Sequence, residues 1–237
     1  MNRLDKQRIG IIAAMATEVT RLHEHLAQPQ RVAVGGIECF LGKIADHEVA
    51  VMQCGIGKVS AGAGAQALIS EFHPDCIINT GCAGALAPQL AIGDIVLATC
   101  TAEWDLDIMK LGFPRGHVMS IGCVKMAADE GINAAIKAVL PQESHVHEGL
   151  VVSGDQFVAS MEQRKTILEA FPDALCTEME GAAIGHVCTQ NHVPFAVIRC
   201  MSDTADSNSS VDFDTFSQEA GEKSAERIIA MLSNGAV

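Results

Sequence analysis

The sequence predicts an α/β fold whose central sheet is largely parallel. Apolar runs with the length of buried strands alternate along the chain with segments of helical periodicity. Several of these runs end directly in a polar turn that contains Gly, Asp or Glu. Hydrophobic residues make up 49% of the 237 residues, enough for a full core, and no linker, repeat or low-complexity segment divides the chain. We therefore expect one domain over residues 1–237.

The N-terminal elements follow from the apolar pattern in order. An uninterrupted apolar strand over residues 8–14 leads into a helix over about 17–26, with Glu18 in its first turn. A hairpin is expected over 32–54, with turns at Gly35-Gly36 and Asp46-His47. An Ala/Gly-rich helix then ends near residues 72–74.

The rest of the chain continues this alternation. Strands are expected over residues 76–79, 95–101, 146–153, 175–177 and 195–201, and helices over 127–140, 161–170, 181–190 and 212–232. Residues 103–121 contain Gly and Pro and have little periodicity. A long aperiodic segment within a compact domain is usually functional or interfacial.

Composition excludes several classes of partner. The net charge is −13, with 29 acidic and 16 basic residues, which disfavours a nucleic-acid backbone or an anionic membrane surface. There is no apolar run of membrane-spanning length, and the polar start Met1–Arg8 has no signal-peptide character. The 9 cysteines are scattered through apolar runs, as free thiols in a reducing compartment would be. We expect a cytoplasmic protein that binds neither nucleic acid nor membrane.

Two motifs look like known sites but fail on spacing. Gly55-Ile-Gly-Lys58 resembles a phosphate loop, yet its glycines are too close and Val59 follows the lysine, so neither the P-loop nor the dinucleotide pattern fits. The pairs His23/His25 and His145/His147 lack a third ligand of suitable spacing, which favours surface histidines over a metal site. Cys82 has no neighbouring His and is interpreted as a small packing residue. We expect no metal and no cofactor.

Four acidic residues form the remaining constellation. They are Glu18, Glu178, Glu180 and Asp203. Each follows an apolar strand at a strand-to-helix junction, where ligands bind in open α/β sheets. Any one of them could be an ordinary helix-start acid, which the helix dipole stabilises. Together they suggest glycosidic chemistry, in which one carboxyl group protonates the leaving group and another activates water. Glu180, at a helix start, is expected to stay ionised and to bind sugar hydroxyls.

Six stretches of the chain resemble one known family. They are Ile9-Gly-Ile-Ile-Ala-Ala-Met-Ala-Thr-Glu-Val19, Cys54-Gly-Ile-Gly-Lys-Val59, Ile77-Ile-Asn-Thr-Gly-Cys-Ala-Gly84, Val151-Val-Ser-Gly-Asp-Gln-Phe157, Glu178-Met-Glu180 and Met201-Ser-Asp203. On these residues the chain resembles the 5′-methylthioadenosine/S-adenosylhomocysteine nucleosidases of the purine nucleoside phosphorylase superfamily. The resemblance implies a three-layer α/β/α fold around a mixed, partly barrel-like sheet. It also implies hydrolysis of the N-glycosidic bond of both nucleosides.

The resemblance assigns roles to residues of this chain. It implies that Glu18 positions and activates the attacking water and that Asp203 gives its proton towards N7 of the purine. Burial would raise the pKa of Asp203, as this role requires. The resemblance also implies where the substrate lies. Met179 and Glu180 are expected at the ribose, Ser202 and the Phe157-Val158 backbone at the base, and Met15, Ile56 and Phe213 at the ribose and 5′-thio tail. The full set of expected substrate-binding residues is Met15, Ile56, Gly84, Phe157, Val158, Met179, Glu180, Ser202 and Phe213. Glu178 is expected to have a supporting role.

Two positions depart from the family pattern. Members usually carry Ser where this chain has Cys82, a weaker hydrogen-bond partner. In residues 103–117 only Asp105 and Asp107 match cleanly the pattern that other members show. The resemblance implies a homodimer in which this loop reaches the partner's active site and caps the 5′ substituent. Apolar side chains along residues 104–113 favour burial against a partner.

The sequence leaves three further activities open. The first is a phosphorylase of the same fold, which needs cations for phosphate, preferably Arg. Phosphorylases of the superfamily carry Arg where this chain has Asn79, and a second one in the region of Glu18. We therefore predict water rather than phosphate as the nucleophile. The second is hydrolysis of aminodeoxyfutalosine, and the third is nucleoside binding without catalysis.

Overall fold

The computed structural model describes residues 7–141, 145–206 and 209–233. Its strands are β1 (Arg8–Ala13), β2 (Ala27–Val34), β3 (Ile37–Ile44), β4 (His47–Gln53), β5 (Cys76–Ala85), β6 (Ile95–Glu103), β7 (Met126–Ala127), β8 (Val146–Ser153), β9 (Ala174–Glu178) and β10 (Phe195–Asp203). Its helices are α1 (Ala16–His25), α2 (Lys58–Ala67), α3 (Glu130–Ala138), α4 (Met161–Ala170), α5 (Gly181–Asn191) and α6 (Ser209–Ser233), and a π-helical turn (Leu68–Phe72) continues α2.

Part of the sheet closes into a ring. The strands pair in the order β10-β6-β8-β9-β5, and β10 also pairs with β5, which returns the ladder to its starting strand. From β5 the sheet extends outward through β1, β4, β3 and β2. The pairs β10–β5, β6–β8 and β8–β9 are parallel, whereas β10–β6 and β5–β9 are antiparallel. The prediction of a mixed, partly barrel-like sheet is confirmed. The sheet is less parallel than the alternation of strands and helices indicates, because β2–β3 and β3–β4 are antiparallel as well.

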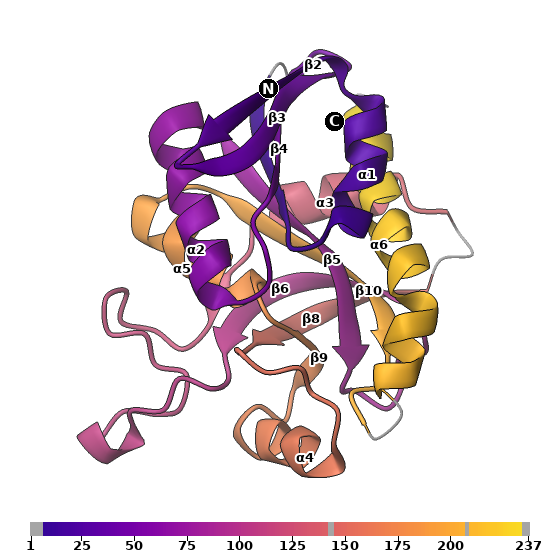
Figure 1. The fold of residues 1–237 in the computed structure, drawn as a ribbon. Coiled ribbons are helices and arrows are strands. Elements are labelled where there is room, and N and C mark those ends of the chain that lie inside the picture. The colour runs from indigo at the N-terminus through magenta and orange to yellow at the C-terminus, as the bar shows by residue number, and fades with distance from the viewer. Residues whose placement is uncertain (1–6, 142–144, 207–208, 234–237) are drawn as a thin grey trace.

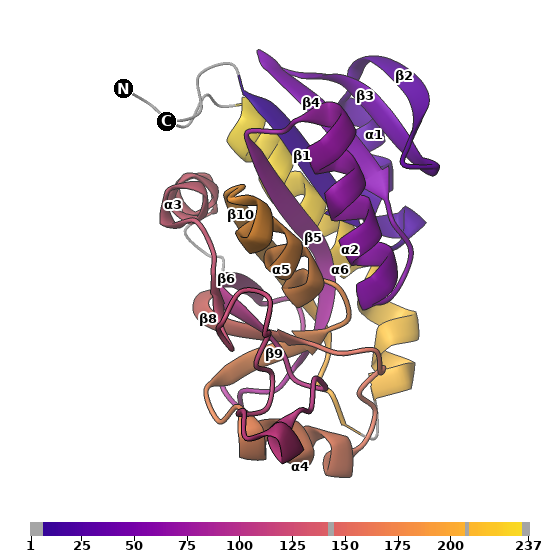
Figure 2. The same ribbon diagram turned by 90° about the vertical axis from the view of Figure 1, so that its left-hand side faces the viewer.

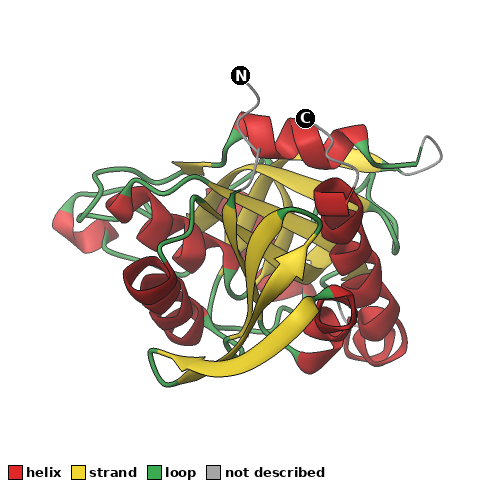
Figure 3. Cartoon of the chain, turned by 90° about the horizontal axis from the view of Figure 1, so that it is seen from above, coloured by secondary structure: helices red, strands yellow, loops and turns green. Residues whose placement is uncertain are grey.

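Helices cover both faces of the sheet. Helices α1 and α3 each contact α6 on one side, while α2 and α5 pack together on the other (Figures 1 and 2). Seen from above, the strands lie between the two groups of helices (Figure 3). None of the helices in the described part of the chain combines the length and the apolar character needed to cross a membrane.

Burial on both faces explains why the central strands are apolar throughout. In β1 the side chains of Ile9, Ile11 and Ile12 have no solvent exposure, although they point to alternate faces. One set packs under α2 and α5, the other under α1 and α6. Every residue of β5 and of β10 is buried.

Several elements differ from the sequence prediction. Strand β5 continues past Asn79 through the Gly-rich segment to Ala85, because that segment pairs with β10 and β9 instead of turning. Strand β2 is a separate strand that starts at Ala27, so the expected hairpin is a three-stranded meander. Helix α3 starts at Glu130 rather than 127, because the Asp129 carboxylate accepts hydrogen bonds from two N–H groups of its first turn.

The aperiodic segment projects from the body at the side of α5 (Figure 1). It contains one short 3₁₀ turn, Met109–Leu111, and the side chains of Met109 and Leu111 are 48% and 68% exposed. Trp104 behaves differently, because it is 4% exposed and packs in the chain's own core. The expectation that Trp104 is covered by a partner is therefore wrong.

Candidate active site

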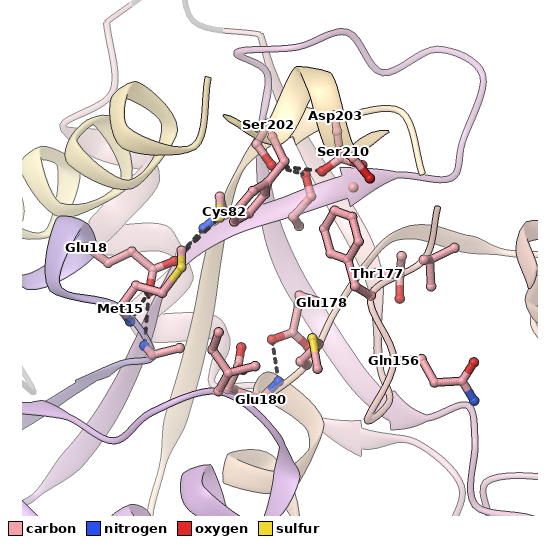
Figure 4. Close-up of a pocket in the computed structure, with 18 of the residues that line it drawn as sticks. Met15, Glu18, Cys82, Gln156, Thr177, Glu178, Glu180, Ser202, Asp203 and Ser210 are labelled. Carbon is pink, nitrogen blue, oxygen red and sulfur yellow. Dashed lines mark hydrogen bonds between the residues drawn. The ribbon is translucent and has the colours of Figure 1, made fainter. Parts of the chain in front are cut away.

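One pocket of about 440 Å³ gathers the residues singled out in the sequence. It lies where the ends of β5, β9 and β10 meet the starts of α1, α5 and α6 (Figure 4). All the predicted site residues line it: Met15, Glu18, Ile56, Gly84, Phe157, Val158, Met179, Glu180, Ser202, Asp203 and Phe213. The structure adds Ala14, Cys82, Ala83, Gln156, Thr177, Glu178, Ser210 and Asp214.

Glu18 is held by backbone amides at the first turn of α1. Its Oε2 accepts hydrogen bonds from the N–H groups of Ala14 at 3.0 Å and Met15 at 2.9 Å. Its Oε1 accepts one from the N–H of Cys82 in β5 at 3.1 Å (Figure 4). These donors come from the end of β1 and from within β5, so they fix the carboxylate in one orientation at the pocket wall.

The Cys82 thiol lies beside the same carboxylate oxygen, with Sγ 3.6 Å from Glu18 Oε1. Burial, and then the charge of Glu18, raise the pKa of this thiol well above its ordinary value. A neutral, buried thiol is a poor nucleophile. The structure thus supports the interpretation of Cys82 as a packing residue.

A buried ion pair lies behind the pocket. Arg199 in β10 is 1% exposed, and its Nη2 donates hydrogen bonds to the Glu178 carboxylate and to Oδ1 of Asn79. The Glu178 carboxylate also accepts from the Ser153 hydroxyl and from the N–H groups of Glu180 at 2.9 Å and Gly181 at 2.7 Å. All of these contacts are structural ones, so Glu178 anchors the start of α5.

Sequence reasoning missed Arg199. A detectable signal existed, because an arginine within an apolar run that forms a two-sided buried strand requires a charged partner. Its partner could not be read from the sequence, since β10 and β9 lie on opposite sides of β5.

Glu180 differs from expectation in its ionisation. Its Oε1 accepts a hydrogen bond from the N–H of Gly57 at 2.9 Å, and its Oε2 lies 3.9 Å from Nη2 of Arg199. Burial and the neighbouring Glu178 carboxylate raise the pKa of Glu180 to about 7. The raised pKa argues against the expectation that Glu180 stays ionised, because the N–H groups at the start of α5 point to Glu178 instead.

Asp203 ends β10 with its carboxylate inside the pocket. Its Oδ1 accepts from the N–H of Ala205 at 2.8 Å, and its Oδ2 accepts from the Ser202 hydroxyl at 2.9 Å. Burial raises the pKa of Asp203, as predicted from its position. Gly84 permits this approach, because a Cβ there would lie 2.6 Å from Asp203 Oδ1.

Apolar side chains also line the pocket. The rings of Phe157 and Phe213 meet edge to face, with centroids 5.3 Å apart and an interplanar angle of 73°. Phe157 is 43% exposed and Ile56 is 58% exposed, so both have surface left for a ligand. The site combines buried carboxyl groups with apolar side chains.

Positive charge is scarce here. Among the described residues that line the pocket there is no Lys, Arg or His, and Arg199 behind it is engaged by Glu178. Within the described ranges, no group of three His, Cys, Asp or Glu side chains is arranged to hold a metal ion. His145 and His147 nevertheless share a neighbour, Asp94, at 3.4 and 3.3 Å, a partner that the sequence did not suggest.

A barrel-like mixed sheet between helices, with a carboxylate-lined pocket at its strand ends, defines a class of nucleoside-processing proteins. Residues 8–233 match the family model described as the phosphorylase superfamily, with which this architecture agrees. Within that superfamily, the chain belongs to the 5′-methylthioadenosine/S-adenosylhomocysteine nucleosidases.

Sequence and structure comparisons agree on this family. The nucleosidase of Shewanella sediminis is 42% identical over 226 residues, covering 95% of this chain and 98% of its own. That of Staphylococcus aureus strain RF122 is 38% identical, covering 95% and 99%. The solved structure of the Neisseria meningitidis nucleosidase with methylthio-immucillin-A superposes with a TM-score of 0.93 at 35% identity, covering 96% and 99%.

Proposed function

We propose that this chain hydrolyses the N-glycosidic bond of 5′-methylthioadenosine and S-adenosylhomocysteine, releasing adenine and the 5′-thioribose product. The observation that carries the proposal is the meeting of Glu18, Glu180 and Asp203 in one pocket without a free cation among its described lining residues. The relatives that match this chain over nearly their whole length bear the nucleosidase name.

The proposed reaction starts at the base. Adenine leaves poorly as an anion, so an acid must protonate it, and the raised pKa of Asp203 supports a proton held for N7. The Ser202 hydroxyl, bonded to the Asp203 carboxyl group at 2.9 Å, orients it. The phenyl ring of Phe157 and the backbone at Val158 complete the base site in this proposal.

Charge then develops on the ribose. Cleavage of the glycosidic bond passes through an oxocarbenium-like state, which nearby carboxylates stabilise. Glu180 and Met179 are assigned to the ribose hydroxyls, and Glu18 to the water that attacks the sugar carbon. The amides that hold Glu18 leave it little freedom, so its carboxylate can orient that water without first reorganising.

Three apolar side chains of the pocket are assigned to the 5′ substituent. Met15, Ile56 and Phe213 provide no charged partner for a 5′ group, which supports thioether tails over a free hydroxyl. A methylene in an apolar pocket is worth only about 1–3 kcal/mol, so both the methylthio and the homocysteinyl nucleoside are expected to react.

The deciding experiment follows free base from methylthioadenosine, adenosylhomocysteine, aminodeoxyfutalosine and inosine, with and without phosphate. We expect adenine release that does not depend on phosphate, because Asn79 and Glu18 occupy the regions where a phosphorylase needs cations. A first-order requirement for phosphate, with ribose 1-phosphate as product, would show phosphorolysis instead. Fastest turnover of inosine would contradict the substrate assignment.

A cytoplasmic homodimer is part of the same proposal, with the loop 103–117 near the partner's active site. The exposed side chains of Met109 and Leu111 on this loop, and of Ile56 and Val59 at the start of α2, support an apolar surface that a second copy covers. Sedimentation at micromolar concentration tests it, since a fully active monomer would refute the dimer. The chain from 1 to 237 is proposed as one domain.

A further inference from the structure

One lysine and two aspartates form a closed ring of hydrogen bonds beside the pocket, and Glu103 joins it through the lysine. Lys58 Nζ donates to Asp105 Oδ1 at 2.5 Å, the N–H of Asp155 donates to Asp105 Oδ2 at 2.8 Å, and the N–H of Lys58 donates to Asp155 Oδ1 at 2.7 Å. Lys58 Nζ also reaches Glu103 Oε2 at 2.9 Å. The ring joins the start of α2, the end of β6 and the segment after β8, which are distant in sequence.

The charges in this ring are well shielded from water. The side chains of Lys58, Glu103 and Asp105 are 16%, 10% and 18% exposed. Burial works to raise the pKa of Glu103, but hydrogen bonds from His186 and Lys58 outweigh it and hold that pKa below its ordinary value. Removing the lysine would therefore leave carboxylates partly buried without their cation, which is strongly unfavourable.

The position of Lys58 is itself informative. It is the first residue of α2, where a cation is disfavoured by the helix dipole. No acidic residue stands in the first turn of α2 to offset that charge. Tertiary contacts in the ring account for the lysine, since local helix preference does not.

The ring contacts the site at two points. Gly57, directly before Lys58, donates its N–H to Glu180 Oε1 at 2.9 Å. Gly57 has φ of 99°, and a Cβ there would lie 3.0 Å from Asp155 Oδ1, so the ring and the glycine fit closely. On the other side, Asp155 directly precedes the pocket residues Gln156 and Phe157.

We propose that Lys58 is a positioning residue, which through Asp105 and Asp155 holds the Gly57 N–H against Glu180 and sets the segment that carries Phe157. It touches no reacting atom. The inference rests on the proposed function for the roles of Glu180 and Phe157, but the ring itself is defined by the contacts above.

The kinetic test compares Lys58→Met with Lys137→Met. Lys137 pairs with Glu148 on the surface, where the two side chains are 55% and 38% exposed. For Lys58→Met we expect kcat for methylthioadenosine to fall by about tenfold, up to the order of 10², because small misplacements near a reacting centre are costly. KM should change by less than about threefold if the loss is specific to the transition state. Lys137→Met should retain wild-type kcat.

Both variants are assayed well below their unfolding temperatures, so that lost stability alone does not lower kcat. Wild-type kcat in Lys58→Met would overturn the inference, as would a rise in KM with kcat unchanged. Absence of turnover in the wild-type protein counts instead against the proposed function.

Hydrogen exchange tests the ring without reference to activity. Amides in residues 55–60 and 154–158 should exchange faster in Lys58→Met than in wild type or Lys137→Met. Unchanged exchange in both segments would overturn the proposal.

A double-mutant cycle of Lys58→Met with Asp105→Asn adds a further check. Because partners in one network are coupled, the double variant should lose less unfolding free energy than the sum of the two single losses. Fully additive losses would mean that Lys58 and Asp105 do not act as a unit.

Discussion

Arg199 and Glu178 neutralise each other across β5, with the guanidinium on β10 and the carboxylate on β9. Asn79, on the intervening strand, accepts a further hydrogen bond from the guanidinium and donates one to the backbone of Ile12 at 2.9 Å. Glu178 and Asn79 thus engage the guanidinium, and the guanidinium engages the Glu178 carboxylate. The charge of this pair thus belongs to the scaffold of the pocket.

Breaking this pair should be costly. In Arg199→Met the Glu178 carboxylate keeps its burial and loses its cation, so we expect the free energy of unfolding to fall by about 3–5 kcal/mol in urea titrations. Arg21→Met provides the comparison, because Arg21 pairs with Glu24 and Glu226 near the surface, and its replacement should cost far less stability than Arg199→Met. Equal losses in both variants would mean that the buried pair contributes no more than an exposed one.

Glu178→Gln and Glu180→Gln should separate structure from chemistry. Glu180→Gln replaces the carboxylate assigned to the ribose, so kcat should fall more than KM rises. Glu178→Gln weakens the pair with Arg199, and its main effect should appear in the unfolding free energy. Steady-state kinetics and denaturation of both variants measure these two effects. If Glu178→Gln abolishes turnover while Glu180→Gln keeps near-normal kcat, the assignment of the ribose carboxylate is wrong.

Asp203→Asn keeps the shape of the side chain but cannot supply a proton. We expect kcat for methylthioadenosine to fall by at least the order of 10², with a modest change in KM. Asp173→Asn is a suitable control, because Asp173 is 59% exposed and pairs with Lys125 on the surface. A kcat near that of the control would remove Asp203 from the role of general acid.

Glu18→Gln should abolish efficient water attack while leaving inhibitor binding measurable by calorimetry. Both oxygens of Glu18 accept backbone N–H groups, so the new NH₂ group must face a donor whichever way the amide lies. We therefore also expect a stability loss of about 1–3 kcal/mol. Normal turnover in a folded Glu18→Gln variant would exclude Glu18 as the residue that activates water.

The raised pKa of Glu180 predicts a pH-dependent stability difference. Its ordinary value is 4.5 and its folded value is about 7. Between these values the unfolded chain releases this proton while the folded chain keeps it, so the wild-type protein loses stability as pH rises. Glu180→Gln lacks this loss. Its unfolding free energy relative to wild type should rise from pH 4.5 to about 7 and then level off.

Thermal melts of both proteins across that range measure the difference directly. A difference that stays flat with pH would show that Glu180 titrates alike in the folded and unfolded chains. A difference that falls as pH rises would show that Arg199 outweighs burial and keeps the carboxylate ionised.

Sequence reasoning located elements and site residues well where local pattern decides. The strand Val146–Ser153 and the helix Met161–Ala170 have the predicted bounds, because an apolar run and a Ser160 cap mark them clearly. The residues assigned to the substrate were found through the resemblance and lie around one pocket.

What was missed depends on contacts between distant segments. Residues 80–85 look like a turn, since glycines usually mark one, yet they form ladder bonds on both sides. The pKa of Glu180 follows from burial and from the nearby Glu178, neither of which a helix-start position reveals. The ring around Lys58 joins three segments that no local pattern connects.

Gly84 pairs with Thr177 of β9 on one side and with Asp203 of β10 on the other, within the closed ring of strands. Moving Asp203 away from Glu178 would therefore break either the ladder between β10 and β5 or the ladder between β5 and β9. Ile56, just before α2, and Phe213, near the start of α6, lie outside that ring. Substitution of these peripheral side chains would change which 5′ group the proposed site admits, while Asp203 keeps its place in the closed ring of strands.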